Sequence, residues 1–367
     1  MQIDMHYYGC YVLARLAGIK ENAANVIASA SQYVDDSYFK DESFGFDDGS
    51  FLQTIITTHN VFGEDEKIEN LKRIRDKEKQ RYVWVPFHFL PGGEGDSFSD
   101  KIICRKNSKI AQIMITNILE KNNLEYYNYL VGIAAHVYAD TFSHYGFSGL
   151  ASDKNKVDGN SIESNNLVNN NIEEYIKNKA GKFFEKYDIS IPSILSDLTE
   201  LSSKALGHGG VATYPDRPYL EWEFEYEDGR KSDRNNKESF LEGAEKLFYF
   251  FKEYTDINPN LVDENSKIGD FNKIKQEISD IIKFEGKKEE RIEKWKNFVK
   301  NDEKYFSNEE KIPVYKGDDW WKSRKELKDE NSVNLNKYPL YQFYRGAAHY
   351  RTYVLRELLP DNEIFVV

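Results

Sequence analysis

The chain has 367 residues, of which 40% are hydrophobic, and it carries a formal net charge of −12. This length suits one large domain or two ordinary ones, and the acidic balance argues against duplex nucleic acid, whose phosphates attract a basic face. Two cysteines without a paired motif exclude a disulfide framework, and the lack of a leader or of an apolar run of about 18–20 residues predicts a cytoplasmic protein with no transmembrane segment.

Helical periodicity dominates the chain. In chain order, we expect helices over residues 5–18, 20–33, 108–122, 124–146, 171–187, 192–207, 237–256, 266–283, 286–301 and 337–358. The best strand signal is Arg81–Phe89, which Pro86 limits, and residues 222–236 are typical of an irregular segment or a hairpin around Asp228-Gly229. The polar stretch Ser152–Asn170 indicates a loop. The sequence therefore predicts an all-α protein with a multi-helix bundle and an added charged helical region.

The most informative run is His136-Val-Tyr-Ala-Asp140-Thr-Phe-Ser-His144, at the end of an apolar helical stretch. Residues i, i+4 and i+8 of an α-helix lie within an arc of about 80°, so all three side chains leave one face. The two histidines are about 12 Å apart along the axis, which is awkward for binding one ion. The spacing suits two ions about 3.5–4 Å apart with Asp140 between them. The alternative is that these polar groups only cap the helix or hydrogen-bond core groups.

Two candidate ligand positions lie near the beginning of the chain. His6 follows Asp4 at the start of the first expected helix, where it is either a ligand or an exposed residue behind an N-terminal cap. Asp35 and Asp36 end the second expected helix, where carboxylates oppose the helix macrodipole. A bound metal would offset this unfavourable charge, so we expect a ligand at this helix end.

Of the remaining histidines, two are candidate metal ligands and two are not. His88 lies in the apolar run Val85–Pro91, where it is either a core group or a ligand. His208 is flanked by glycines, which permit close approach of the backbone to an ion. His59 and His349 have no nearby carboxylate motif, so we expect both to lie outside any metal coordination shell.

The run from Gly132 to His144 resembles the signature helix of the zinc-dependent phospholipase C superfamily. Its spacing is most similar to that of the catalytic domain of glycosylphosphatidylinositol-specific phospholipase D, and single-strand-specific zinc nucleases are more distant members. The resemblance implies a largely helical domain that holds two or three zinc ions, or other divalent ions, which activate water to cleave phosphodiester bonds. It covers mainly residues 1–220.

The resemblance also implies ligands at matching positions. His136 and Asp140 match the core histidine and the bridging aspartate, and His144 matches the histidine of a second ion. His6 is similar in position to the N-terminal histidine of the family. Secreted members use their first residue as a ligand, and Asp4 would take that place here.

Further matches follow along the chain. The element that ends in Asp35-Asp36 is similar to an early Tyr-Pro-Asp element of the family, which makes Asp36 or Asp35 a ligand and the catalytic base. His88 resembles the histidine that lies between that element and the signature helix. His208 and Asp216 would fill the late histidine and carboxylate positions. We expect these ligands to converge in a cluster about 10 Å across.

The resulting hypothesis is a metal-dependent phosphodiester hydrolase of phospholipase C type. Asp36 or Asp35 would orient the metal-activated water, and Arg217 would hold the phosphate of a small phosphodiester or a phospholipid headgroup. Two alternatives stay open: a metal-containing binding or structural protein without catalysis, and a nuclease-like phosphodiesterase. The chain contains no HExxH run and no GxxxxGK[ST] loop, which argues against a zincin protease and a P-loop nucleotide hydrolase.

The expected organisation has three regions. Residues 1–220 form the metal-binding catalytic helical domain, and residues 221–335 form a charged helical extension or insertion. Residues 336–367 form a C-terminal helix that packs back on the core.

Overall fold

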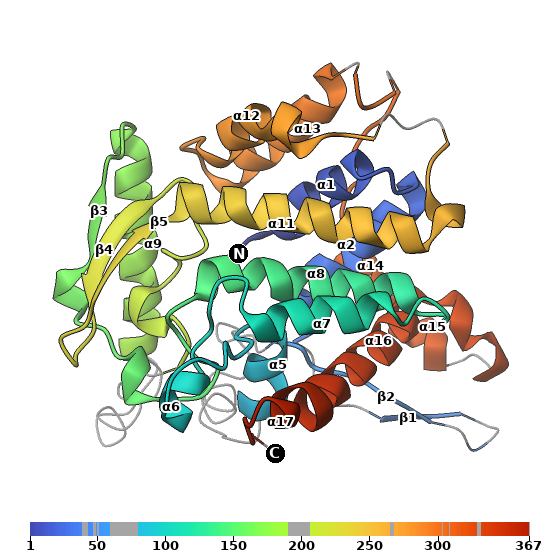
Figure 1. The fold of residues 1–367 in the computed structure, drawn as a ribbon, viewed down its shortest axis with the longest axis horizontal. Helices are drawn as coiled ribbons and strands as arrows, with labels where there is room; N and C mark the ends of the chain where they lie inside the picture. The colour runs from blue at the N-terminus through green and yellow to red at the C-terminus, as the bar shows by residue number, and fades with distance from the viewer. Residues whose placement is uncertain are drawn as a thin grey trace.

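A computed structural model describes residues 1–38, 43–46, 49, 51–58, 80–189, 206–264, 268–302, 304–307, 309–328 and 332–366 (Figure 1). These residues are mostly helical, as the sequence predicts. The α-helices are α1 (Cys10–Leu16), α2 (Glu21–Asp36), α5 (Val85–Phe87), α6 (Phe98–Lys101), α7 (Lys109–Leu119), α8 (Tyr127–His144), α9 (Asn170–Ile189), α11 (Asn236–Ile257), α12 (Phe271–Ile282), α13 (Lys288–Asn301), α14 (Gly317–Lys322), α15 (Arg324–Lys328), α16 (Pro339–Tyr353) and α17 (Leu359–Asp361).

Shorter helical turns and strands complete the described fold. The π-helical turns are η1 (Asp4–Gly9), η2 (Gln80–Trp84) and η8 (Val354–Leu358). The 3-10 turns are η3 (Asp153–Asn155), η4 (Gly159–Ser161), η5 (Gly209–Val211), η6 (Pro259–Leu261) and η7 (Ser332–Lys337). The strands are β1 (Ser43–Gly45), β2 (Phe51–Gln53), β3 (Glu163–Asn165), β4 (Glu221–Glu225) and β5 (Lys231–Asn235). No helix among the described residues has the length and apolar character needed to cross a bilayer.

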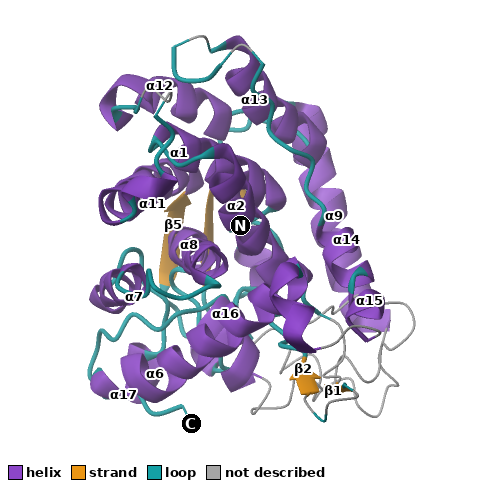
Figure 2. Cartoon of the chain, turned by 90° about the vertical axis from the view of Figure 1, so that its right-hand side faces the viewer, coloured by secondary structure: helices purple, strands orange, loops and turns teal. Residues whose placement is uncertain are grey.

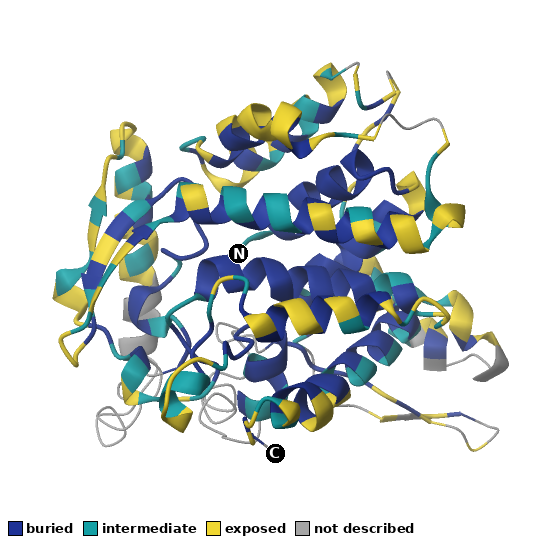
Figure 3. Ribbon diagram, in the orientation of Figure 1, coloured by how far each residue is buried: buried dark blue, intermediate teal, exposed yellow. Residues whose placement is uncertain are grey.

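Helix α8 is the central element of the fold. Figure 2 looks along it and shows α2, α7, α11 and α16 around it. Its residues, including those of its polar face, are buried over nearly the whole length (Figure 3), because other elements surround the helix. Gly132 lets α2 approach closely, because a Cβ at this position would lie 2.3 Å from the carbonyl oxygen of Ile27. The tight α2–α8 contact fixes the end of α2 beside the polar face of α8.

A small antiparallel sheet, in the order β3-β4-β5, covers the C-terminal end of α8. The predicted hairpin is confirmed, and Trp222 of β4 lies opposite Arg234 of β5. The buried guanidinium of Arg234 donates hydrogen bonds to the carbonyls of Ser143, at 2.5 Å, and Tyr145, at 2.8 Å. These carbonyls have no partner within the helix, so Arg234 caps the end of α8 that carries His144.

The sequence and the structure differ in two segments. The strand expected over Arg81–Phe89 is wrong, because this segment forms η2 and α5. Pro86 lies in the first turn of α5, where a missing N–H removes no hydrogen bond. The expected loop Ser152–Asn170 contains the short strand β3. Most of the helix expected over 192–207 lies outside the described residues.

Candidate metal centre

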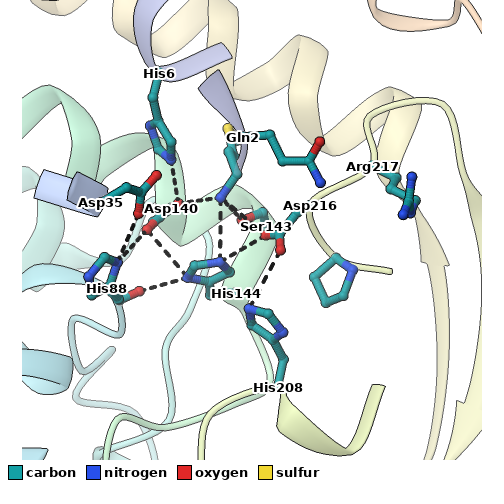
Figure 4. Close-up of polar contacts among 12 residues, drawn as sticks. Gln2, His6, Asp35, His88, Asp140, Ser143, His144, His208, Asp216 and Arg217 are labelled. Carbon is teal, nitrogen blue, oxygen red and sulfur yellow. Dashed lines mark hydrogen bonds and ion pairs between the residues drawn. The ribbon is translucent and has the colours of Figure 1, made fainter. Parts of the chain in front are cut away.

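The carboxylate of Asp140 lies at the centre of a buried polar cluster (Figure 4). Its Oδ2 is 3.1 Å from Nε2 of His136 and 3.4 Å from Nδ1 of His144. The histidines four residues before and after Asp140 on α8 thus lie beside the same carboxylate. Oδ2 is also 3.4 Å from Nδ1 of His88, and Oδ1 is 3.1 Å from Nε2 of His6. The Asp140 carboxylate, on one face of α8, therefore lies close to imidazoles from α8 itself and from other segments.

The other side chains of the cluster come from different segments of the chain. His6 lies in η1, Asp35 in the last turn of α2, and His88 directly after α5. His208 directly precedes η5, and Asp216 lies between η5 and β4. Residues that are far apart in the sequence thus converge beside α8, as the sequence predicts for most of them.

The converging side chains form three groups with ligand atoms close enough to share an ion. Within each group these atoms lie within 4.8 Å of one another, and the groups are His6-His136-Asp140, Asp35-His88-His136 and His144-His208-Asp216. The first two groups share His136. Imidazole nitrogens and carboxylate oxygens are the ligands of zinc-like ions, so the described part of the chain holds His/Asp clusters that could bind metal ions.

Backbone carbonyls orient three of the imidazoles. Nε2 of His88 donates to the carbonyl of Thr57 at 2.9 Å, and Nδ1 of His144 donates to the carbonyl of His88 at 2.9 Å. Nδ1 of His208 donates to the carbonyl of Ala212 at 2.7 Å. A carbonyl only accepts, so each bond places the ring proton away from the cluster and leaves the other nitrogen with a free lone pair. Metal-binding histidines are held in this way.

Several buried polar atoms of the cluster lack a hydrogen bond within the described residues. They are both ring nitrogens of His6, Nδ1 of His136 and Oδ2 of Asp140. An unsatisfied buried polar atom costs about 1–3 kcal/mol. Coordination to a cation would satisfy Oδ2 of Asp140 and a nitrogen of His6, so the donor set fits metal ions better than a purely structural network.

The electrostatics of the cluster favour imidazoles in their ligand form. Burial lowers the pKa of His6 and of His208 to about 4 and lowers that of His136 well below its usual range. Burial and the nearby Asp140 raise the pKa of Asp35 well above its usual range. Neutral imidazoles can coordinate a metal without losing a proton, and crowded carboxylates gain from a nearby cation.

The α-amino group of Met1 also lies in the cluster. In the sequence as given, its nitrogen is 2.7 Å from Oδ1 of Asp140, 3.2 Å from Oδ1 of Asp216 and 3.5 Å from Nε2 of His144. Burial disfavours its charged form, but these carboxylates outweigh burial and raise its pKa to about 11. The cluster thus contains this amino group and not the Asp4 carboxylate. Sequence patterns concern side chains and could not identify the amino group.

Asp4 lies outside the three groups. Its buried carboxylate accepts hydrogen bonds from Nε of Arg291 at 2.7 Å and from a terminal nitrogen of Arg291 at 3.1 Å. The carboxylate is thus committed to an ion pair between η1 and α13, and the structure replaces its expected ligand role with a structural one.

Replacing Asp4 with asparagine is expected to lower stability without removing metal. The change leaves the buried Arg291 without its counter-charge, which costs about 3–5 kcal/mol. Urea unfolding checks the stability, and elemental analysis checks the metal content. Loss of bound metal at unchanged stability would contradict this role for Asp4.

The two aspartates at the end of α2 point to different partners. Asp35 joins a ligand group, whereas Oδ2 of Asp36 accepts a hydrogen bond from the Tyr315 hydroxyl at 2.6 Å. The structure therefore places Asp35, and not Asp36, among the candidate ligands. Asp36 lines the adjacent cleft.

These neighbours form a matched pair for mutation. Asp35→Asn is expected to lower the affinity of one metal site by at least about tenfold, because it replaces a charged ligand by a neutral one. Asp36→Asn makes the same chemical change one residue later and is expected to keep the full metal content. Titration with zinc, followed by calorimetry, checks both variants. Equal losses in the two variants would argue against this assignment.

The other candidates are placed as follows. Arg217 is buried, and one terminal nitrogen donates to Oγ1 of Thr213 at 3.1 Å. His349 lies outside the cluster and contacts the Tyr126 hydroxyl at 3.1 Å through Nδ1, in agreement with its prediction. His59 lies outside the described residues.

A cleft of about 940 Å³ opens beside the cluster. Met1, Asp35 and Asp216 connect it with the candidate ligands. Aromatic and basic side chains also line the cleft. They are Tyr33, Tyr38, Tyr175, Tyr315, Trp321, Lys179, Lys182, Arg217 and Lys288. This volume suits a small organic ligand. The cleft gives such a ligand access to the candidate metal centre.

Fold and site together define a mostly helical protein with a buried His/Asp centre at the side of a cleft. Residues 1–358 match the family model DUF6765, which is described as a family of unknown function, and the chain belongs to this family. No curated protein and no solved structure matches the chain.

Proposed function

We propose that this protein is a metal-dependent phosphodiester hydrolase of phospholipase C type, built on a helical fold of that type. The observation that carries the proposal is the convergence of three His/Asp groups on one carboxylate beside an open cleft. Zinc fits the mixture of imidazole and carboxylate ligands best, and other divalent ions of similar preference are possible occupants.

The candidate residues have distinct roles in this proposal. His6 and Asp140 would hold one ion, Asp35 and His88 a second, and His144, His208 and Asp216 a third, and the single lone pair of neutral His136 is available to either of the first two ions. When bound, such ions make water more acidic and neutralise negative charge on phosphate oxygens.

The chain's own groups account for proton transfer and binding. Water adds to phosphorus, the bond to the leaving alcohol breaks, and the products are a phosphomonoester and an alcohol. Asp35 is the candidate base, because it faces the cleft and its side chain is 30% exposed, against 1% for Asp140. It takes one proton from the water, and this proton passes to the leaving oxygen. Arg217, which lines the cleft, is the candidate donor of hydrogen bonds to a phosphate of the substrate.

Two alternatives remain for comparison. A protein that keeps the metal ions only for binding or stability would show full metal occupancy without turnover. A nuclease-like enzyme would cleave short oligonucleotides in preference to small phosphodiesters. Neither has a specific observation in its favour here, and the net charge of −12 disfavours long nucleic acids.

The test is hydrolysis of bis-(p-nitrophenyl) phosphate and p-nitrophenylphosphorylcholine by zinc-loaded protein. We expect turnover that disappears after chelation and returns on adding zinc. Short single-stranded oligonucleotides form the third substrate and test the nuclease alternative. Full metal occupancy with no turnover of any of the three would favour the binding or structural alternative.

A further inference from the structure

One wall of the cleft gathers positive charge in an otherwise acidic protein. Tyr175, Lys179 and Lys182 of α9 all line the cleft. They are at positions i, i+4 and i+7 of the helix, so they form one stripe. Among the side chains that the structure describes, none forms an ion pair with either lysine. Exposed lysines are common on helices, so this stripe alone does not define a binding site.

Arg217 provides an independent observation on the same wall. Its side chain is only 3% exposed, and its Nε has no hydrogen-bond partner among the described residues. Its other contacts are to neutral hydroxyls, those of Thr213 and Tyr219, and it forms no ion pair within the described chain. A buried cation without a counter-charge is costly, and an anion in the cleft would remove that cost.

The aromatic ring of Tyr175 joins these cations into one patch. The guanidinium carbon of Arg217 is 5.2 Å from the ring centroid, and Nζ of Lys179 is 5.8 Å from it. Nζ of Lys287, the residue before α13, is 5.7 Å from the same centroid. Three cations thus surround one ring at the cleft. Carboxylates also line the cleft: Asp35 and Asp216 belong to the candidate metal centre, Asp36 and Asp318 lie on α2 and α14, and Glu289 lies on α13, two residues from Lys287.

We infer that this wall is a subsite for a second anionic group, so that the preferred substrate is a phosphodiester that also carries a phosphomonoester. The inference rests on the proposed hydrolase function and deepens it. The diester would lie at the His/Asp groups, while Lys179, Lys182 and Arg217 bind the second phosphate. Lysine and arginine both bind phosphate through charge-assisted hydrogen bonds.

A matched pair of chromogenic substrates tests the subsite. Thymidine 5′-(p-nitrophenyl phosphate) and its 3′-phosphorylated form differ only in the second phosphate, and release of p-nitrophenolate reports diester cleavage in both. We expect zinc-loaded protein to show a KM about tenfold lower for the phosphorylated form, as one to two charge-assisted hydrogen bonds would give. The Lys179→Gln/Lys182→Gln variant should lose this preference and keep its activity on the simpler substrate.

The control variant makes the same charge change away from the cleft. Lys177→Gln/Lys231→Gln removes two exposed lysines that do not line the cleft, so its preference should equal that of the unmodified protein. Metal content is measured in all three proteins. A preference that persists in the Lys179/Lys182 variant would show that the second phosphate binds elsewhere, for example at the metal ions, and would overturn the inference. Equal KM values for both substrates in the unmodified protein would overturn it as well.

A binding measurement separates failure of the subsite from failure of the hydrolase proposal. Calorimetry compares thymidine 3′,5′-bisphosphate with thymidine 5′-monophosphate on the same three proteins. Tighter binding of the bisphosphate that is lost only in the Lys179/Lys182 variant supports the subsite even if no substrate is cleaved.

A last experiment compares the cleavage of lipids in phosphatidylcholine vesicles with and without phosphatidylinositol 4-phosphate. Faster cleavage of the phosphorylated lipid identifies a lipid headgroup as the source, and activity on soluble substrates alone identifies a free phosphodiester.

Discussion

Replacing Asp140 with asparagine is expected to remove hydrolysis and to release more than one metal ion per chain. The carboxylate is 3.1 Å from His6 and from His136 and 3.4 Å from His88 and His144, so it borders all three ligand groups. An amide has one oxygen instead of two and no charge to attract a cation. We expect turnover to fall by at least about 10³-fold, the scale on which enzymes lose rate when a group that stabilises charge is removed.

The control for this variant is Asp36→Asn. It makes the same exchange in a residue that lines the same cleft but belongs to none of the three groups. Circular dichroism shows whether both variants keep their helices, and elemental analysis gives the number of ions. An Asp140→Asn protein with full metal content and undiminished activity would refute the bridging role.

Removing the metal ions is expected to cause a large loss of stability. Without metal ions, the centre contains the buried carboxylates Asp140 and Asp216 beside the half-buried Asp35, and several of its nitrogen and oxygen atoms lack hydrogen bonds within the described residues. A ligand that binds only the folded state at 1,000 times its Kd adds about 4 kcal/mol, so chelation should remove roughly that amount per tightly bound ion. Calorimetric unfolding with and without chelator measures the change.

Reloading distinguishes specific metal binding from a side effect of the chelator. Zinc should restore the unfolding temperature, whereas magnesium should not, because it prefers oxygen ligands and the centre is rich in imidazole. The same unfolding temperature in chelated and zinc-loaded protein would argue against a metal centre in the folded chain.

The fold was predictable where a long periodic pattern specified a helix. Helix α8 is one example, because its apolar residues and its i, i+4, i+8 polar triplet both follow helical geometry. The segment Arg81–Phe89 was misassigned because a short apolar run does not distinguish a strand from a helical turn. Strand β3 was missed because its three residues, Glu163–Asn165, are polar, and it forms only by pairing with β4, over fifty residues later.

The site was predictable where a residue type in its local context suggested a ligand. Asp140 and His144 are of this kind. The sequence does not predict which of Asp35 and Asp36 is the ligand. Neighbouring residues of a helix point about 100° apart, and only the packing of α2 decides which of the two faces the cluster. The ligand role expected for Asp4 is wrong because its carboxylate pairs with Arg291, which lies far along the chain and which no local pattern indicates.

The number of metal ions bound by the purified chain tests the central claim most directly. The purified protein is loaded with zinc, dialysed against metal-free buffer and measured by elemental analysis. The account predicts two or three zinc ions per chain, because two of the three His/Asp groups share His136, and fewer than two in the Asp140→Asn protein. A chain that retains no zinc, or the same amount with and without the Asp140 carboxylate, would contradict it.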